Sequence, residues 1–308
     1  MKTVRAFAPA SVSNVCCGFD LFGFAVRGPG DLVEARRSDQ PGIVIREITG
    51  DDDRLPRQAE SNTAGVAAAR LLARHGAEAV GVELAIHKQM PLASGLGSSA
   101  ASAVAAVVAV NALLDLGSAR EILLACAVEG ERMACGTAHA DNAAPSLYGG
   151  FVMVRGLRVD RLPVPPGLAC ALVRPDVEVE TRSARQAIGD SVPLTRAVTQ
   201  WGNTAALVAG LCQNDLRLLA SALVDVVAEP LRTDAVPGFD QAKDAALAAG
   251  ALGAGLSGSG PSIFALVEST ERAQEVARAM SQALQSAAGL SADTWVTLVE
   301  APGARVVR

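Results

Sequence analysis

The chain has 308 residues, half of them hydrophobic, and a net charge of −5 at pH 7. A chain of this length buries a sizeable core and is expected to divide into two domains. The acidic balance argues against a basic surface for nucleic acid or an anionic membrane, so neither partner is predicted. The first residues lack the apolar core of a signal peptide, and the longest apolar run, 103–114, is too short to span a bilayer. We therefore expect a soluble cytoplasmic protein.

The cysteines give information about the redox compartment. They lie in apolar surroundings and include no CxxC pair, which argues against a disulfide framework or a zinc site. We expect all of them to be buried free thiols in a reducing cytoplasm. They are Cys16, Cys17, Cys126, Cys135, Cys170 and Cys212.

The first half of the chain predicts a mixture of strands and helices. Alternating apolar residues indicate strands around 4–8, 43–45 and 80–86, and residues 148–155 also have strand character. Helices are predicted at 61–75, 98–115 and 118–135, the first of them capped by Ser61 or Asn62.

The second half begins after a proline-rich break, "LPVPPG" at 162–167, which separates two predicted domains, 1–160 and 161–308. Strands are expected at 168–174, twice within 252–268, and at 293–300. Helices are expected at 182–188, 194–212, 215–228, 239–249 and 270–287. Because strands and helices are interspersed in both halves, the residues alone indicate an α+β or α/β class.

Residues 91–102, "PLASGLGSSAAS", place two glycines and two serines directly before a predicted helix. Unpaired N–H groups and the dipole at a helix start favour an anion, which suggests a phosphate site. A P-loop is excluded because Ser98 stands where its lysine should be, and Ala100 replaces the third glycine of a dinucleotide fingerprint. An ordinary glycine-containing turn remains open. A hydroxyl of Ser98 or Ser99 would suit Mg²⁺, so we favour ATP binding without a P-loop lysine.

Four motifs carry a resemblance to a known family. The glycine loop is similar to the PxxxGLGSSAA signature of the GHMP small-molecule kinases, and "GLSGSGPSIFALV" (255–267) is similar to their third motif. "APASVSNVCCGFDLFGFAV" (8–26) and "HADNAAPSLYGGF" (139–151) resemble the PAxxxNxxxGFDxxG and HxDNxAPxxxGG motifs of the homoserine kinases within that superfamily. Cys16 and Cys17 are unusual before Gly18 and leave the backbone geometry of that loop open.

The resemblance implies a two-domain α+β fold, with an N-terminal domain of the ribosomal-protein-S5-like βαβ type and a ferredoxin-like C-terminal domain. It implies MgATP-dependent transfer of the γ-phosphoryl group to the hydroxyl of L-homoserine, giving O-phospho-L-homoserine for threonine biosynthesis. It also implies a homodimer, for which the sequence locates no interface. Two alternatives stay open: a GHMP kinase of mevalonate or sugar type, and a non-catalytic binding module on the same fold.

The resemblance assigns ATP and the metal to the glycine loop and one glutamate. Ser99 and Glu131 would hold Mg²⁺, with Ser98 as the alternative to Ser99, although the residue types alone would make Glu131 a solvated helix carboxylate. Residues 58–66 and Lys88 are weaker candidates for an adenine site. The predicted ATP-binding residues are Pro91, Leu92, Ala93, Ser94, Gly95, Leu96, Gly97, Ser98, Ser99, Ala100 and Ala101.

The resemblance also implies an amino-acid site. Asp20 would bind the ammonium group, and Arg185 and Arg232 would hold the carboxylate, since a guanidinium offers two donors in a fork. Taken alone, an asparagine before a turn is usually a backbone cap, and an isolated arginine is usually a surface residue. The predicted substrate-binding residues are Asn14, Asp20, His139, Asp141, Asn142, Thr181, Arg185, Arg232, Gly258 and Gly260.

The predicted catalytic residues are Asn142, Asp141 and Arg185. Mevalonate kinases use an aspartate of this region as a base, whereas the motif here places Asn142 at that position, and an amide cannot accept a proton at neutral pH. We therefore expect substrate alignment and in-line attack without a strong side-chain base, with Asp141 as the alternative base.

Overall fold

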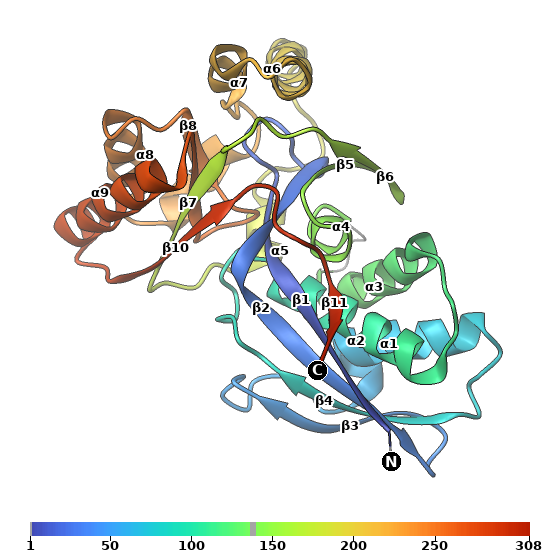
Figure 1. The fold of residues 1–308 in the computed structure, drawn as a ribbon. Coiled ribbons are helices and arrows are strands. Elements are labelled where there is room, and N and C mark those ends of the chain that lie inside the picture. The colour runs from blue at the N-terminus through green and yellow to red at the C-terminus, as the bar shows by residue number, and fades with distance from the viewer. Residues whose placement is uncertain (1, 136–139) are drawn as a thin grey trace.

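The protein folds around two β-sheets, which the computed structural model describes over residues 2–135 and 140–308 (Figure 1). Within those residues the first sheet has seven strands in the order β11-β1-β2-β4-β3, with β5 paired to β2 and β6 to β5. Its strands are β1 (Thr3–Ser13), β2 (Phe22–Ser38), β3 (Gly42–Thr49), β4 (Gly81–His87), β5 (Phe151–Arg155), β6 (Arg158–Leu162) and β11 (Arg305–Val307).

Helices α1 (Thr63–Arg74), α2 (Ser98–Leu114) and α3 (Arg120–Cys135) gather on one side of this sheet, as Figure 1 shows. The central helix α2 packs against β1, β2, both of these helices and the short α4 (Ala143–Tyr148). It consists mainly of alanine and valine and is buried on almost every side, as expected of a helix inside a core. The glycine loop therefore leads into a helix that is held from all sides.

The second sheet has four antiparallel strands in the described part of the chain, in the order β10-β7-β9-β8. With a helical segment after its first strand and a helix after its third, it follows the ferredoxin-like βαββαβ pattern. Its strands are β7 (Ala169–Pro175), β8 (Gly253–Leu256), β9 (Ile263–Val267) and β10 (Ala292–Leu298). The helices of this half are α5 (Thr181–Gln186), α6 (Leu194–Gln213), α7 (Leu216–Ala222), α8 (Phe239–Ala248) and α9 (Thr270–Ala288), with single 3₁₀ turns at Glu229–Leu231 and Thr233–Ala235.

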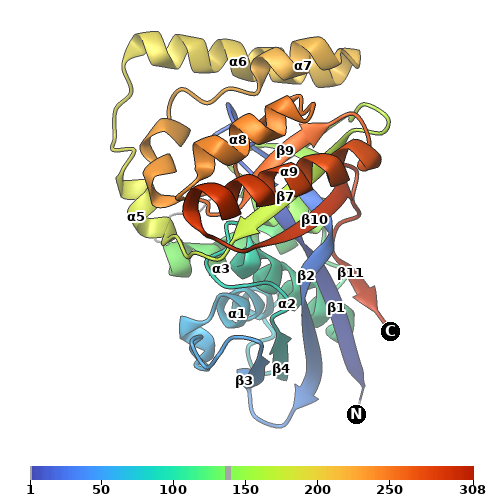
Figure 2. The ribbon, with the colours of Figure 1, turned by 90° about the vertical axis from the view of Figure 1, so that its left-hand side faces the viewer.

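Strand β7 is buried on both faces and joins the two halves of the molecule. Its residues Ala169 and Ala171 pack with α8 and α9, whereas Cys170 and Leu172 belong to the core that also contains the first sheet and the α6–α7 pair. Figure 2 shows α8 and α9 against the second sheet and α6–α7 as a separate layer beyond it. The loops of both sheets therefore meet on a common, rigid support.

The α+β content agrees with the predicted class, but the sequence does not predict β2, α4, β6 or β11. Strand β2 contains Gly28, Pro29 and Gly30, which locally favour a turn. The strand nevertheless pairs with β1 across a register shift between Pro9 and Ser11. Long-range pairing has overridden the local turn signal.

Two further expectations are wrong. The helix predicted at 215–228 ends at Ala222, because the Asp225 carboxylate accepts hydrogen bonds from the N–H groups of residues 227–229 and so stabilises a turn. Cys212 is exposed, since it lies on the outer side of α6. The predicted burial of free thiols is confirmed for Cys16, Cys17, Cys126 and Cys170. The Cys135 side chain lies outside the described part.

The last strand, β11, pairs with β1, so residues near the C-terminus belong to the first sheet. The predicted domain boundary at 160/161 does not account for this return of the chain to the first sheet. In other respects the boundary remains a prediction. Among the described residues, no helix has the length and apolar character needed to cross a membrane.

Candidate active site

The glycine loop connects β4 to α2 and leaves the start of α2 open. Gly97 precedes the helix with φ 67°, and no side chain caps the helix, so its first N–H groups are available to a ligand. A Cβ on Gly97 would lie 2.4 Å from Ser11 Oγ and 2.7 Å from Asn142 Oδ1. A Cβ on Gly95 would lie 2.6 Å from the Gly260 carbonyl oxygen. Both positions require glycine because other segments approach the loop backbone so closely.

A cavity of about 460 Å³ lies at this helix start. Its wall combines the glycine loop, the start of α1, Glu131 of α3, Thr181, and residues 258–259. Seven predicted ATP-binding residues line it, namely Leu92, Ala93, Ser94, Gly95, Gly97, Ser98 and Ser99. Pro91, Leu96, Ala100 and Ala101 do not line it, and the last three are fully buried behind the loop. The location suits an elongated anion at a helix N-terminus.

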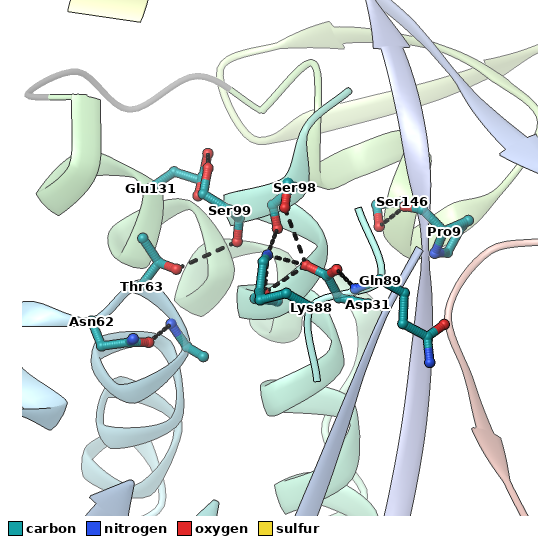
Figure 3. A network of polar contacts seen from close by, with 12 residues as sticks. Pro9, Asp31, Asn62, Thr63, Lys88, Gln89, Ser98, Ser99, Glu131 and Ser146 are labelled. Carbon is teal, nitrogen blue, oxygen red and sulfur yellow. Dashed lines mark hydrogen bonds and ion pairs between the residues drawn. The ribbon is translucent and has the colours of Figure 1, made fainter. Parts of the chain in front are cut away.

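Ser99 and Glu131 form a pair on the wall of this cavity (Figure 3). Ser99 Oγ donates to Glu131 Oε2 at 3.0 Å, whereas Glu131 Oε1 is buried without a hydrogen-bond partner in the described part of the protein. Burial raises the pKa of Glu131 to about 7, against the opposing effects of Ser99 and Lys88. A buried, unpartnered carboxylate oxygen beside a hydroxyl is a donor set that suits Mg²⁺.

A buried ion pair lies beside the glycine loop, as Figure 3 shows. Lys88 Nζ donates to the Asp31 carboxylate, to Ser102 Oγ at 2.7 Å and to the Ser98 carbonyl oxygen at 2.9 Å. Asp31 also accepts from Ser102 Oγ at 2.7 Å and from Ser98 Oγ at 3.4 Å. Because Ser98 is engaged with this pair and Ser99 with Glu131, Ser99 is the better placed of the two serines for a metal.

A second, smaller cavity of about 90 Å³ adjoins the first. Eight of the predicted substrate-binding residues line it, although they come from segments far apart in the sequence: Asn14, Asp20, Asp141, Asn142, Thr181, Arg185, Arg232 and Gly258. Gly260 lines neither cavity and has φ 82° in the β8–β9 connection. His139 lies outside the described residues.

The loop of residues 14–20 reaches this cavity with an unusual backbone. Residues 14–16 all have positive φ, at 69°, 46° and 57°, a conformation that costs about 1–2 kcal/mol per L-residue. Helix α6 contributes to holding the loop, because Gln200 Nε2 and Thr204 Oγ1 both donate to the Cys17 carbonyl oxygen, at 3.1 and 2.9 Å. The loop around Cys16 and Cys17, whose backbone geometry the sequence left open, is therefore a left-handed turn supported by helix α6 of the C-terminal half.

Among the described residues, the cavity is lined by one charge pair, one further cation and two carboxyl groups, those of Glu131 and Asp141. Arg185 Nη1 lies 2.5 Å from Asp20 Oδ2, so these two charges compensate each other. Arg232 is 6% exposed and donates to the carbonyl oxygens of Ala184 and Gly258. No carboxylate of the described residues lies within ion-pair distance of Arg232, whose pKa is lowered by burial. A buried guanidinium without a counter-ion favours an anionic ligand.

Two asparagines connect the cavity walls. Asn14 Nδ2 donates to the Gly258 carbonyl oxygen at 3.0 Å, and its Oδ1 accepts from a backbone N–H in its own loop. Asn142 Oδ1 accepts from Ser11 Oγ at 2.8 Å, and its Nδ2 donates to Ser13 Oγ at 3.0 Å. The backbone-capping role that the residue type suggests for Asn14 therefore coexists with its place in the cavity.

Asp141 is a buried carboxyl in the same wall. Burial, followed by repulsion from Asp20, raises the pKa of Asp141 to about 7, while a hydrogen bond from Ser13 acts in the opposite direction. A carboxyl that titrates near neutral pH within a cavity is a candidate proton acceptor.

The two cavities share part of their walls. Five residues line both of them, namely Glu131, Asn142, Thr181, Gly258 and Ser259. Thr181 Oγ1 lies 3.3 Å from Ser259 Oγ, so the start of α5 and the β8–β9 connection meet at this shared wall. An anion at the start of α2 and a second ligand in the small cavity would thus approach each other along the shared wall.

Comparisons with known proteins identify the family. The family models for the "GHMP kinases N terminal domain" and the "GHMP kinases C terminal" match residues 62–150 and 207–286. Homoserine kinases of Chloroherpeton thalassium and Chlorobium phaeobacteroides are 44% and 46% identical to this chain, over 100% of both chains in each case. The chain belongs to the homoserine kinase family of the GHMP kinases.

Comparison with solved structures shows that the family's fold extends over the whole chain. The crystal structure of homoserine kinase from Cytophaga hutchinsonii has a TM-score of 0.96 and 49% identity, covering 100% of this chain and 98% of that one. The L. major mevalonate kinase in complex with R-mevalonate, at 15% identity and a TM-score of 0.72, shares the fold alone. The predicted family and its two-domain α+β fold are confirmed.

Three features of this homoserine kinase family member are absent from the sequence-based predictions. They are the Lys88–Asp31 pair, the support of the 14–20 loop by Gln200, and the side chain of Phe19 in the small cavity. Lys88 is one of only three lysines in the chain, and its rarity is the one signal that could have marked it. Gln200 carries no signal of this kind, because its partners lie far away in the sequence, and Phe19 is marked only as the central residue of GFD in the motif at 8–26.

Proposed function

We propose that this chain transfers the γ-phosphoryl group of ATP to the hydroxyl of L-homoserine, giving O-phospho-L-homoserine, in the cytoplasm and as part of threonine biosynthesis. One observation carries the proposal: the cavity at the start of α2 and the small charged cavity share five lining residues. Phosphoryl transfer depends mainly on bringing donor and acceptor oxygens into line, and two adjoining sites serve that requirement.

The larger cavity would hold ATP. Its triphosphate would lie against the open N–H groups of α2 and the glycine loop, where the helix dipole favours negative charge. Ser99 and Glu131 would hold Mg²⁺, which neutralises charge on the phosphate oxygens when bound. Within the described residues no cluster of three metal-binding side chains occurs, so further ligands would come from the nucleotide and water.

The smaller cavity would hold homoserine. The substrate carboxylate would lie at Arg232, whose buried charge lacks a counter-ion, and the ammonium group would lie at Asp20, which already pairs with Arg185. Binding a zwitterion between these groups would give Arg232 a counter-ion and place the ammonium group beside the Asp20 carboxylate. Asn14, Thr181 and Gly258 would complete the site by shape and hydrogen bonding.

The hydroxyl of the substrate would lie near the shared wall. Asn142, held by Ser11 and Ser13, would align it, and its amide accepts no proton at neutral pH. Asp141 is the alternative proton acceptor, because its raised pKa of about 7 suits general-base catalysis. If Asp141 acts as the base, the pH profile of kcat contains an ionisation that disappears in Asp141→Asn. If Asn142 only aligns the substrate hydroxyl, the pH profile of kcat shows no such ionisation.

The decisive experiment measures ATP consumption with L-homoserine, R-mevalonate and galactose in parallel. We expect turnover with homoserine that exceeds the other two by orders of magnitude, with O-phosphohomoserine as the product detected by ³¹P NMR. Equal or higher turnover with mevalonate or galactose would favour another GHMP kinase. No turnover with any acceptor, despite ATP binding, would favour a binding module. The expected homodimer is tested separately by analytical ultracentrifugation, where a monomer at micromolar concentration would contradict it.

A further inference from the structure

A single aromatic ring contacts both arginines of the small cavity. The guanidinium carbon of Arg185 lies 4.7 Å from the centre of the Phe19 ring, and that of Arg232 lies 5.2 Å from it. Both distances are within the range of cation–π attraction. Phe19 itself lines the cavity, so the ring that contacts the two cations is also part of the wall facing a ligand.

The ring is held in place by its loop. Phe19 stands next to Asp20 and two residues after Cys17, whose carbonyl oxygen is bound by α6. The Asp20 N–H donates to Asn14 Oδ1, which fixes the other end of the loop. Phe19 is only partly buried, unlike the fully buried Phe22 and Phe24 that follow it. A purely structural core aromatic would be expected to share their burial.

The charges explain what such a ring can do. Arg185 and Arg232 carry like charges in one small cavity, and Asp20 forms an ion pair with Arg185 but attracts Arg232 only from beyond ion-pair distance. The electron-rich faces of an aromatic ring attract cations, so Phe19 offsets part of the repulsion without adding a negative charge. A carboxylate in place of the ring would compensate Arg232 and remove its demand for an anion. A neutral ring keeps the guanidinium planes oriented and leaves the charge of Arg232 available.

We propose that Phe19 is a specificity-determining positioning residue that holds Arg232 beside the Arg185–Asp20 pair, so that Arg232 recognises the carboxylate of the amino-acid substrate. This inference rests on the proposed homoserine kinase function. It assigns Phe19 no part in proton transfer or in binding ATP. Its effect is confined to how strongly the enzyme prefers a substrate with a carboxylate over one without it.

The test compares kcat/KM for L-homoserine and for 2-amino-1,4-butanediol, which lacks the carboxylate, in wild type, Phe19→Leu and Phe19→Tyr. Leucine fills similar space without a π face, whereas tyrosine keeps it. We expect Phe19→Leu to lose roughly five- to thirtyfold of the preference for homoserine, mainly through KM, because cation–π contacts of buried groups are of this size. We expect Phe19→Tyr to restore most of it, and the KM for ATP to stay within twofold throughout.

Phe7→Leu is the matched control, because the Phe7 ring contacts Arg305 at 4.9 Å far from both cavities. It should leave the substrate preference unchanged. The inference is overturned if Phe19→Leu keeps the full preference for homoserine. It is also overturned if Phe19→Leu and Phe19→Tyr both lower kcat and reduce the affinity for the two acceptors by the same factor. Failure of the proposed function itself shows differently, as a wild type that does not prefer homoserine at all. If Phe19→Leu does not fold, Phe19→Met serves in its place and is judged by the same ratio.

Discussion

The two adjoining cavities are built in different ways. In the larger one, a continuous segment, the glycine loop and the start of α2, contributes more lining residues than any other segment and offers backbone N–H groups and small hydroxyls. The smaller one is formed by residues from six distant segments, at 13–20, 131, 141–142, 181–185, 232 and 258–259, and five of these residues have ionisable side chains. A backbone site recognises a group common to many ligands, whereas a set of opposed charges recognises one particular arrangement. The difference indicates that reaction type and substrate choice are determined by separate parts of the molecule.

The largest effect is expected at the wall that both cavities share. Glu131→Gln keeps the size of the side chain but removes the charge that would hold Mg²⁺, so kcat should fall about 10²–10³-fold. Steady-state kinetics at saturating Mg²⁺ checks this, with circular dichroism to show that the fold persists. Glu129→Gln is the matched control on the same helix, because Glu129 lies outside both cavities and pairs with Arg132. Near-normal turnover in Glu131→Gln would remove the residue from the metal site.

The next effect separates the two arginines of the smaller cavity. Arg232→Ala should raise KM for homoserine at least about a hundredfold, since loss of a buried charge partner costs on the order of 3–5 kcal/mol. Arg232→Lys should also be damaging, because an ammonium lacks the planar fork. Arg185→Ala should cost less, roughly tenfold, because Arg185 is partly exposed and already paired with Asp20. Substrate titrations with all three variants check this order, and a larger effect at Arg185 would reverse the assignment.

A smaller effect tests the support of the substrate loop. Gln200→Leu removes a donor to the Cys17 carbonyl oxygen, so the left-handed turn at 14–16 should relax and KM for homoserine should rise about tenfold. KM for ATP should not change, because the glycine loop is held independently. Asn203→Ala is the control, since Asn203 lies on the same helix and bonds the Val224 carbonyl oxygen instead. Equal changes in both KM values would mean that Gln200 acts on the whole fold.

The smallest effect concerns stability. The folded protein holds the Asp141 proton more tightly than the unfolded chain, because the pKa of Asp141 is raised from 3.8 to about 7. The stabilising effect of that proton is complete below pH 4 and is lost as pH rises through 7. Asp141→Asn avoids this loss, so its Tm relative to wild type should rise by a few degrees between pH 5 and 8. Glu131, whose pKa is raised mainly by burial and least by Asp141, is present in both proteins, so most of its contribution cancels. A Tm difference independent of pH would contradict the raised pKa.

The contrast between the two cavities also explains which features could be predicted from the sequence. The glycine loop could be recognised because its glycines, its serines and its helix are neighbours in the chain, and the family and fold inferred from it are confirmed. The roles of its individual residues remain predictions. Local rules failed at β2, where pairing with β1 outweighs two glycines and a proline, and at residues 223–228, where one aspartate ends a helix.

The sequence predicted most of the residues that line the smaller cavity, but not which of their side chains contact one another. The sequence assigns Asp20 and Arg185 to opposite ends of a substrate, whereas the structure pairs them with each other. It leaves Phe19 without a role, although its ring contacts two arginines that follow it by 166 and 213 residues in the numbering. Such contacts depend on how the two sheets pack, which no local pattern encodes.

The return of β11 to the edge of the first sheet has a mechanical consequence. Because the chain leaves that sheet after β6 and comes back to it at residues 301–307, the ferredoxin-like unit is connected to the first sheet by two covalent crossings. Relative displacement of the two units is therefore restrained by both connections and by the two cores to which β7 contributes. A single proteolytic cut in either crossing would leave the two units joined by the other one.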